Sequence, residues 1–330
     1  MDNVSLLILT DHRTHSEHNS FYGLFRAFYR HPKLNNVTVA SRQYAKNAPF
    51  FKGEMQAPLY GFSPAPLPFS DWKWPPHKKL QVLSVDSFDI VFLRLPEPSP
   101  DVFFTQLESS FPNVLFINRP SGILKTGSKA YLTHFPNLCP PLRLLHSPKE
   151  ALDLSQEMDI VLKPLRNYGG KGILKIEKNQ LFLGNQKYDV SEIDQFWDSR
   201  GSMLAMKYLP FLKAGDKRTV VANGQIQFST VRYPPADSWI CNVAQGGRSE
   251  MSAPSPEETD MATQLAEKLL PEGIVLFGFD TLADEKGTRK LSEINVQSIG
   301  GIIPAELESG KPISDDIVSQ LLNYASEQLS

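Results

Sequence analysis

Two apolar segments near the end of the chain are each interrupted by side chains that carry oxygen ligands. Asp280 follows the run 273–279, and Glu293 and Asn295 lie two residues apart within the run 291–296. Because side chains two residues apart in a β-strand point to the same face, pairing of the two segments would bring these three together. Such hard oxygen ligands suit Mg²⁺ that is bound together with substrate phosphates. The alternative is three polar side chains on a solvated face, and the apolar flanks favour the site.

A glycine-rich loop could supply phosphate contacts beside such a metal site. Lys163 ends an apolar run shortly before Gly169-Gly170-Lys171-Gly172, and glycine amides can approach a phosphate without hindrance from Cβ. A tight turn with an exposed lysine is the plainer alternative. The segment 122–129 comes close to a P-loop, but a P-loop places lysine directly after glycine and the hydroxyl after lysine. We therefore reject a P-loop and keep Lys129 as a candidate phosphate or adenine contact.

Arginines and a second glycine loop provide further candidates. Arg218 and Arg232 could hold an acyl phosphate or a substrate carboxylate through paired hydrogen bonds, or could be surface salt-bridge partners. The loop 242–248, with Gly246 and Gly247, could place backbone donors beside them. The triplet His12, His15 and His18 has the spacing of one helical face, but the polar residues between favour a solvated loop over a metal site. Whether these histidines bind anything stays open.

Composition limits the class of protein. The chain has 330 residues, 34 Lys+Arg against 36 Asp+Glu, and a formal net charge of -2. This length predicts two domains, possibly three, and the charge balance argues against nucleic-acid or membrane-surface partners. Cys139 and Cys241 form no CxxC pair, and no apolar run approaches the length of a membrane span. We expect a soluble cytoplasmic protein.

The first part of the chain, residues 1 to about 118, alternates apolar strands with helices. Strands are expected at 4–9, 37–40, 88–93 and 114–117, and helices at 21–29 and 101–110. This pattern predicts an α/β domain with a parallel sheet covered on both faces. The 26 prolines exceed average usage, and seven of them fall in 49–76. We expect this segment to be an extended loop without a helix or a central strand.

The second part changes to hairpins. Segments 160–163 and 173–176 flank the glycine loop, and Asn223-Gly224 marks a two-residue turn. A helix over 256–270 begins with Ser255 as N-cap, Pro256 next and Glu258 three residues after the cap. The segments 274–282 and 290–296 form the closing strand pair. This part is therefore expected to be α+β with antiparallel pairing.

Together these segments resemble the ATP-grasp ligases, and within them most closely the bacterial glutathione synthetases. The resemblance is carried by Leu162-Lys163-Pro164-Leu165 with Gly169-Gly170, by Tyr208-Leu209-Pro210 with Gly215-Asp216-Lys217-Arg218, and by Gly278-Phe279-Asp280 with Glu293-Ile294-Asn295-Val296. It implies a Rossmann-like pre-ATP-grasp domain at 1–118, a lid or central subdomain at 119–200 and a catalytic subdomain at 201–330.

The resemblance also implies roles for single residues. ATP would be bound by Lys129, Lys163, Gly169, Gly170, Met206, Lys207, Tyr208, Leu209, Asp216 and Asn295. Mg²⁺, or alternatively Mn²⁺, would be held by Asp280, Glu293 and Asn295. The catalytic residues would be Arg218, which stabilises an acyl phosphate, and Arg232. Arg94, Gly246 and Gly247 would contact the substrate.

The implied reaction is ATP-dependent amide formation through an acyl phosphate, with γ-glutamylcysteine and glycine as the small-molecule substrates and glutathione as the product. Three features depart from the family: Ile240-Cys241 replaces an arginine-glycine pair, Leu95-Pro96-Glu97-Pro98 replaces a charged residue and paired prolines, and 49–76 has no clear counterpart. A ligase with another amino acid, a dipeptide or a protein tail as acceptor therefore stays open, as do an inactive nucleotide-binding homologue and a homo-oligomer.

Overall fold

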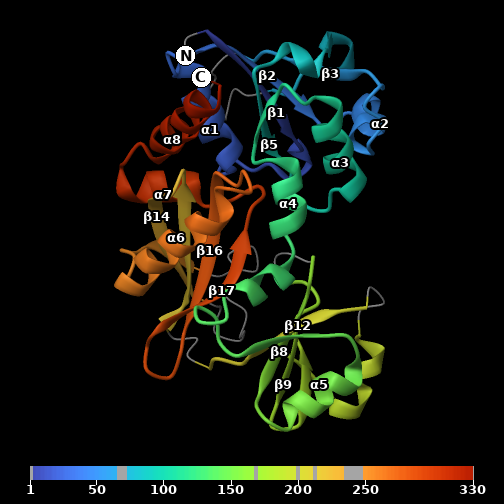
Figure 1. Cartoon of the computed structure of the whole chain (residues 1–330), viewed down its shortest axis with the longest axis vertical. Helices are drawn as coiled ribbons and strands as arrows, with labels where there is room; N and C mark the ends of the chain where they lie inside the picture. The colour runs from blue at the N-terminus through green and yellow to red at the C-terminus, as the bar shows by residue number, and fades with distance from the viewer. Residues whose placement is uncertain are drawn as a thin grey trace.

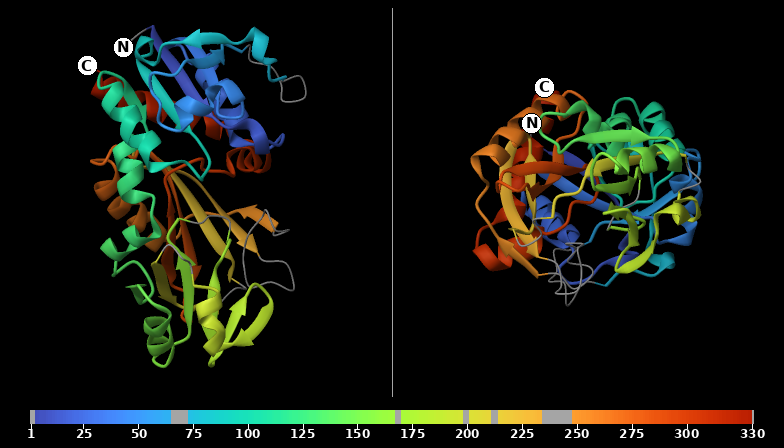
Figure 2. Two further views of the ribbon diagram at one scale, coloured as in Figure 1. Left: turned by 90° about the vertical axis from the view of Figure 1, so that its right-hand side faces the viewer. Right: turned by 90° about the horizontal axis from the view of Figure 1, so that it is seen from below.

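Three β-sheets follow one another along the long axis of the molecule (Figure 1). The computed structural model describes residues 3–64, 73–166, 170–197, 201–210, 214–233 and 248–329. Sheet A, with helices α1 and α8, lies at one end, and sheet B, with α5, lies at the other. Sheet C lies between them, and Figure 2 shows the same order from the side.

Sheet A has the strand order β4-β3-β2-β1-β5-β6. Strand β1 pairs in parallel with β2 and β5, and β5 pairs in parallel with β6, as the alternation of strands and helices predicts. The remaining strands, β3 and β4, pair antiparallel. The bounds are β1 Val4–Thr10, β2 Leu34–Ser41, β3 Leu59–Phe62, β4 Gln81–Leu83, β5 Ile90–Arg94 and β6 Leu115–Ile117.

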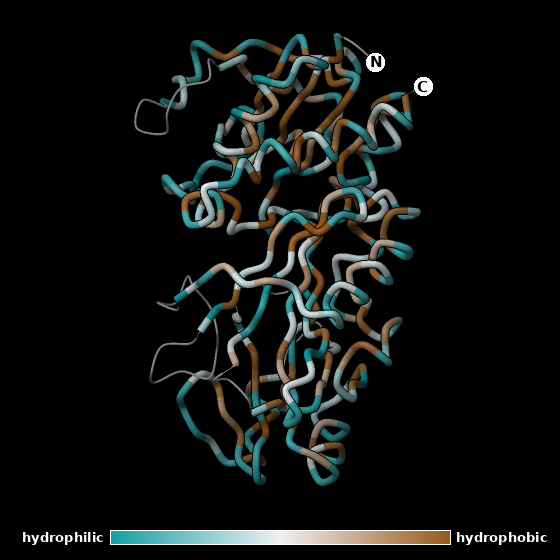
Figure 3. Tube along the Cα trace, turned by 90° about the vertical axis from the view of Figure 1, so that its left-hand side faces the viewer, coloured by the Kyte–Doolittle hydropathy of each residue, from teal (hydrophilic) through white to brown (hydrophobic). Residues whose placement is uncertain are grey.

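The two faces of β1 explain how sheet A is covered. Leu6 and Ile8 pack with α1 (Ser20–Arg30) and α8 (Ile313–Gln328), whereas Leu7 and Leu9 pack with α3 (Asp101–Ser110). A strand that is apolar on both faces requires helices on both sides. Figure 3 shows apolar segments along these inner strands and hydrophilic segments on the connecting loops. The predicted α/β layer is confirmed.

The expectation of an extended loop over 49–76 is wrong in part. A short helix, α2 (Ala48–Phe51), begins there with Pro49 in its first turn, and strand β3 (Leu59–Phe62) pairs with both β2 and β4. Proline is compatible with the first turn of a helix because that turn leaves its N–H groups unbonded anyway. Strand β3 contains no proline, since Pro58 and Pro64 lie outside it. The sequence pattern missed the five proline-free residues between them, four of which form the strand.

Sheet B has the order β11-β10-β9-β8-β12-β7, and its neighbours pair antiparallel. It forms a separate core with helix α5 (Pro148–Ser155). The predicted hairpin on either side of the glycine loop is present as β8 and β9. The bounds are β7 Leu142–Leu145, β8 Ile160–Pro164, β9 Leu174–Glu177, β10 Gln180–Leu183, β11 Gln186–Asp189 and β12 Met203–Lys207.

Sheet C has the order β15-β14-β13-β16-β17, with antiparallel pairing throughout. The predicted turn at Asn223-Gly224 joins β13 to β14, and both turn residues have positive φ, as such a turn requires. The bounds are β13 Asp216–Ala222, β14 Gln225–Tyr233, β15 Arg248–Met251, β16 Leu276–Ala283 and β17 Arg289–Asn295.

Helix α6 (Pro256–Leu269) begins where the sequence predicts. The Ser255 side chain accepts from the Glu258 amide, and the Glu258 side chain accepts from the Ser255 amide at 2.8 Å, so the capping box is complete. The remaining helices are α4 (Pro120–Thr126), which contains most of the near-P-loop segment, and α7 (Ile302–Ser309). Short 3-10 turns cover His12–Thr14, Ala45–Asn47, His77–Lys79, Val85–Ser87, Lys129–His134 and Val190–Gln195.

Asn118 fixes sheet A to sheet C. Its amide nitrogen donates to the carbonyls of Leu276 and Val296 at 2.6 and 2.8 Å, and its oxygen accepts from the Val275 amide at 2.8 Å. The side chain is buried, so these bonds are shielded from water. One residue thus sets the position of β16 and of the segment after β17, where the candidate ligands lie.

The predicted domain boundaries at 118 and 200 stay predictions; β12, which begins after the second of them, pairs in sheet B. Among the residues that the structure describes, no helix is long and apolar enough to cross a membrane. Cys139 is a buried free thiol, and burial raises its pKa to about 12. Cys241 lies outside the described residues.

Candidate active site between sheets B and C

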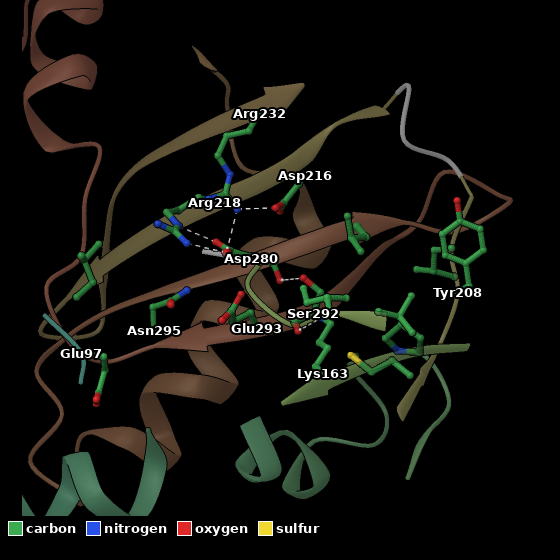
Figure 4. Close-up of a pocket in the computed structure, with 18 of the residues that line it drawn as sticks. Glu97, Lys163, Tyr208, Asp216, Arg218, Arg232, Asp280, Ser292, Glu293 and Asn295 are labelled. Carbon is green, nitrogen blue, oxygen red and sulfur yellow. Dashed lines mark hydrogen bonds and ion pairs between the residues drawn. The ribbon is translucent and has the colours of Figure 1, made fainter. Parts of the chain in front are cut away.

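A cavity of about 380 Å³ opens between sheets B and C (Figure 4). This volume is within the usual range for small-molecule sites. One wall comes from strands β8 and β12 of sheet B and the residues after β12, and the other wall comes from sheet C. The lining residues are Pro96, Glu97, Pro140, Val161, Lys163, Gly170, Ile173, Met206, Lys207, Tyr208, Leu209, Asp216, Arg218, Arg232, Asp280, Leu282, Ser292, Glu293, Asn295, Gln297, Ser298 and Ile299.

The register of β16 and β17 brings the three candidate metal ligands to this cavity. Asp280 is the cross-strand partner of Glu293, and Gly278 is the partner of Asn295. Partners in an antiparallel pair lie on the same face, and all three oxygen-bearing side chains line the cavity. Gly278 has no side chain, which leaves space beside Asn295. The three side chains therefore converge on one cavity, as the alternation of side chains along the two strands indicates.

Two arginines and two aspartates form a linked cluster at the centre of the sheet C wall (Figure 4). Arg218 donates from Nε and Nη2 to the two oxygens of Asp280, each at 2.7 Å. Arg232 reaches Asp216 at 2.5 Å and Asp280 at 2.9 Å. Because Arg218 pairs across the sheet with Asp280, and Asp216 with Arg232, the strand register itself creates the cluster.

Burial and neighbouring charges shift the pKa values within the cluster in opposite directions. Burial raises the pKa of Asp280, but Arg218 and Arg232 outweigh it and hold that pKa well below its usual range. Burial raises the pKa of Asp216 to about 7, although Arg232 opposes the shift. The pKa of Arg232 is raised because Asp280 and Asp216 outweigh the effect of burial. Opposed shifts of this kind within one cavity are typical of functional sites.

Two lysines approach the cluster from the other side. Lys163 on β8 donates from Nζ to the Ser292 carbonyl at 2.9 Å, and burial lowers its pKa. Lys129 does not line the cavity, but its Nζ lies 3.1 Å from Glu293, and its side chain is 6 % exposed. Lys129 therefore contacts a carboxylate of the wall directly, and Lys163 contacts the backbone beside that carboxylate. Lys163 is therefore not an exposed lysine beside a tight turn, which is the alternative interpretation of this segment.

The strand β12 and the residues after it supply an apolar slot. Met206, Lys207, Tyr208 and Leu209 line the cavity. Val161, Ile173 and Leu282 line it too, and sequence analysis did not identify them. Val161 lies two residues before Lys163, and Leu282 two residues after Asp280, so the same alternation could have found both. An apolar lining beside polar groups is suited to a heterocyclic base.

Some predicted site residues lie elsewhere. Arg94 is buried at the end of β5 and is not part of the cavity wall. Gly170 lines the cavity, whereas Gly169, Gly246 and Gly247 lie outside the described residues. The region also includes side chains that no motif indicated, namely Pro96, Glu97, Pro140, Ser292, Gln297, Ser298 and Ile299. Ser292 lies within β17, and the others come from connecting segments, where periodicity gives no signal.

The histidine triplet is not the solvated loop that we expected. His12 stacks on Trp74 with ring centroids 3.9 Å apart and planes at 7°, and His15 lies edge-on to the same indole. Only His18 is exposed. No group of three or more His, Cys, Asp or Glu side chains within the described ranges is arranged to hold a metal ion.

The oxygen set at the cavity still fits Mg²⁺ by the chemistry of its donors. Asp280, Glu293 and Asn295 offer two carboxylates and a carboxamide, which Mg²⁺ prefers to nitrogen or sulfur ligands. The buried amide nitrogen of Asn295 has no hydrogen-bond partner within the described part of the chain. Because a carboxylate oxygen has more than one lone pair, the arginine bonds of Asp280 leave capacity for a cation.

Comparison with known proteins gives one family match. Residues 128–309 match the family described as "Prokaryotic glutathione synthetase, ATP-grasp domain". A glutathione synthetase of Brucella melitensis is 30% identical over 231 residues, which cover 68% of this chain and 70% of the relative. A glutathione synthetase of Prochlorococcus marinus is 26% identical over 263 residues, 77% of this chain and 82% of the relative.

Solved structures with the same fold cover nearly the whole chain. The D-cycloserine synthetase DcsG superposes with a TM-score of 0.64 at 12% identity, over 97% of this chain and 99% of that one. The ATP-grasp ligase PsnB, solved with a minimal precursor, Mg and ADP, gives 0.59 at 14% identity, over 98% and 99%. At these identities the likeness concerns the fold alone. It places all three sheets within one known architecture.

Proposed function

Since the chain belongs to the prokaryotic glutathione synthetase family of ATP-grasp proteins and is an ATP-dependent, ADP-forming ligase of the glutathione-synthetase type, we propose that it joins γ-glutamylcysteine to glycine. The observation that supports this most is that Asp280, Glu293 and Asn295 line one cavity together with Lys163 and the apolar residues around Tyr208. An oxygen-ligand set, an ammonium and an apolar slot are the three requirements of a Mg-nucleotide site.

In this proposal ATP lies with its base in the slot formed by 206–209 and with its phosphates between Lys163 and Lys129. The two ammonium groups neutralise phosphate charge, and Gly170 covers the phosphates with backbone that lacks Cβ. Asp216 and Asn295 complete the nucleotide contacts. All of these except Lys129 line one cavity, and Lys129 contacts Glu293 directly.

Asp280, Glu293 and Asn295 would hold Mg²⁺, which when bound neutralises developing charge on the phosphates. The remaining work belongs to the protein's own side chains. Arg218 on β13 and Arg232 on β14 both contact Asp280, so they are positioned to stabilise negative charge on the transferred phosphoryl group. Catalysis would then consist of positioning and preorganised electrostatics rather than of covalent steps by the enzyme.

The reaction balances in two steps. A carboxylate oxygen of the first substrate attacks the γ-phosphorus of ATP, and the bond to the β–γ bridging oxygen breaks to release ADP. The amine of the second substrate then attacks the acyl carbon, phosphate leaves with the former carboxylate oxygen, and the amine loses one proton. Exclusion of water during the second step prevents hydrolysis of the acyl phosphate.

A ligase with a different acceptor is the second candidate. It is favoured by Ile240-Cys241, which stands where the glutathione synthetases resembled here have an arginine-glycine pair. An isoleucine side chain cannot bind a carboxylate, so the sequence lacks one anchor for the peptide substrate at that position. Another amino acid or a dipeptide could then replace glycine or γ-glutamylcysteine.

ADP release by the purified protein separates the two candidates. We expect Mg-ATP turnover to require γ-glutamylcysteine and glycine together, and the product to co-migrate with glutathione by mass spectrometry. The Glu293→Gln variant is the matched control for contaminating ATPases. Turnover that is unchanged by γ-glutamylcysteine and glycine, but stimulated by another carboxylate-amine pair, would reject glutathione as product and retain the ligase chemistry.

A further inference from the structure

A buried lysine of sheet B lies beside the aromatic end of the cavity between sheets B and C. Lys175 on β9 is 6 % exposed, and its Nζ lies 4.5 Å from the ring centroid of Phe182 and 4.7 Å from that of Tyr208. An ammonium within about 6 Å of a ring centroid is attracted to the π electrons of that ring. One cation therefore contacts two aromatic rings at once.

The strand register directs Lys175 toward the cavity. Lys175 is the cross-strand partner of Val161 on β8 and of Phe182 on β10. Cross-strand partners in an antiparallel sheet point to the same face, and Val161 lines the cavity. The side chain of Lys175 therefore leaves sheet B on the face that the cavity occupies, although Lys175 itself is not among the described residues that line it.

A carboxylate and two ring faces are partners of the Lys175 ammonium. Its Nζ donates to Oε2 of Glu177 at 2.7 Å, and the side chain of Glu177 is 28 % exposed against 8 % for that of Lys175. Lysine is rarely buried to this degree unless its ammonium has partners. The rings of Phe182 and Tyr208 add to the ion pair, so the positions of Lys175 and Tyr208 depend on each other.

The ring of Tyr208 lies at one end of the cavity (Figure 4). Its backbone amide donates to the Asp159 carbonyl at 2.8 Å, which fixes the main chain but not the side-chain torsions. Burial, together with the charges of Glu177 and Asp159, raises the pKa of Tyr208, so the phenol is neutral at pH 7 and the ammonium interacts with a ring face rather than with a phenolate. The contact with Lys175 therefore restrains the ring itself.

We propose that Lys175 is a positioning residue of the nucleotide site, whose ammonium holds the Tyr208 ring as the end wall of the slot for the base. The inference rests on the proposed function, because that proposal places the base against 206–209. Lys129 and Lys163 face the phosphates in the same proposal. Lys175 instead acts on the base through Tyr208, and it contacts neither the phosphates nor the ligase substrates.

Steady-state kinetics of Lys175→Met test this role. Methionine can still pack on the rings, but it carries no charge. We expect KM for ATP to rise about fivefold, the size expected for a partly buried cation–π contact, while kcat and the KM values of the carboxylate and amine substrates change less than twofold. A lysine that only stabilises sheet B would lower the melting temperature and leave KM for ATP unchanged, and that result would overturn the proposal.

Lys187→Met is the matched control. Lys187 on β11 is the other cross-strand partner of Phe182, but it is exposed, so its removal should leave KM for ATP within twofold of the wild type. Lys175→Arg is the conservative variant. Because a guanidinium also binds a ring face, it should restore most of the affinity that Lys175→Met loses. An equal rise in KM for ATP in Lys187→Met, or in Lys175→Arg, would contradict a role for the charge at this position.

A double variant shows whether Lys175 acts through Tyr208. Tyr208→Leu removes the ring, so a further Lys175→Met change should raise KM for ATP by less than twofold in that background. Another fivefold rise would mean that Lys175 acts independently of the ring, and it would overturn the proposal.

Binding measurements keep this test independent of the reaction product. Mg-ATP and Mg-tripolyphosphate, which lacks the base and the ribose, are titrated calorimetrically into wild type and Lys175→Met. We expect Lys175→Met to weaken ATP binding about fivefold and tripolyphosphate binding less than twofold. If glutathione synthesis fails but this selective loss is observed, the inference holds and the proposed product is wrong. If both probes weaken equally, or if ATP binding is unchanged, Lys175 does not act on the base and the inference is wrong.

Discussion

The arginines in the cavity wall of sheet C have carboxylate partners, whereas the arginine at the carboxyl edge of sheet A has none within the described residues. Arg218 and Arg232 contact the carboxylates of Asp280 and Asp216 at 2.5 to 2.9 Å. Arg94 forms no ion pair within the described residues, and its neighbours Thr10 and His15 also carry atoms without partners. One region balances its charges internally, and the other leaves a positive charge unbalanced.

This difference indicates what each region has still to bind. A wall with its own carboxylates can accept a cation and its nucleotide with little net change in charge. An unbalanced guanidinium gains most from a ligand that brings a negative charge. The wall of sheet C is therefore suited to a cation with its nucleotide, and the edge of sheet A is suited to an anion.

The largest effect is expected from Asp280→Asn. This variant removes the negative charge that binds both arginines, and it weakens one proposed metal ligand. The rate of ADP formation should therefore fall about a thousandfold, which corresponds to a barrier higher by about 4 kcal/mol. A coupled ADP assay measures the loss. Glu293→Gln, at a carboxylate that is 23 % exposed, should give a similar loss with less risk to folding. Activity within tenfold of the wild type in Glu293→Gln would contradict a catalytic role for the carboxylates of this wall.

The other face of β13 offers a structural contrast. Glu258 accepts from Lys217 at 2.5 Å and from the Thr281 hydroxyl at 2.7 Å, away from the cavity. Glu258→Gln should lower the free energy of unfolding by about 3 kcal/mol, because it leaves a buried ammonium unpaired. Urea denaturation measures this change. If KM for ATP rose more than twofold in the folded variant, the two faces of the strand would not be independent.

The histidines at the edge of sheet A predict a pH dependence of stability. Burial lowers the pKa of both His12 and His15 to about 4, against 6.5 for a free histidine. The unfolded chain therefore binds more protons between pH 6.5 and 4, and stability is present above pH 6.5 and lost as pH falls through that window. Asp11, whose pKa is lowered to about 2, loses its contribution only below this range.

Urea midpoints at pH 7 and pH 5 measure the effect, which should be about 3–4 kcal/mol for the two histidines together in the wild type. The double variant His12→Gln, His15→Gln should lose clearly less between the same two pH values. An equal loss in both proteins would mean that other groups cause the dependence.

The smallest effect is expected at the cap of α6. Ser255→Ala removes the side-chain acceptor of the Glu258 amide and should cost about 1 kcal/mol of stability. Thr263→Ala, on the exposed side of the same helix, is the control and should change stability by less than about 0.5 kcal/mol. Because this helix packs behind sheet C, neither change should alter ATP binding.

Local rules explain why the cavity wall could be predicted. Asp280, Glu293 and Asn295 are positioned by alternation within two strands, and Ser255 with Glu258 by a motif four residues long. Each of these patterns is complete within a short segment. The α/β layer and the antiparallel hairpins of sheets B and C followed from the same kind of reasoning.

The edge of sheet A could not be predicted in this way. The stack of His12 on Trp74 joins residues far apart in the chain, and no periodicity connects them. The polar spacing around His12 and His15 favoured a solvated loop because polar residues usually face water, yet burial here depends on an indole from the proline-rich segment. Strand β3 was missed for a related reason, since its partners lie on β2 and β4.

The most direct test of the central claim follows an oxygen atom. Cysteinyl-carboxylate ¹⁸O-labelled γ-glutamylcysteine is incubated with glycine, Mg-ATP and the protein, and the released phosphate is analysed by mass spectrometry. Transfer through an acyl phosphate predicts that phosphate carries ¹⁸O from the carboxylate, and that the label disappears in Glu293→Gln. Phosphate without ¹⁸O, released together with ADP, would mean that water attacks ATP and would contradict the proposed ligase reaction.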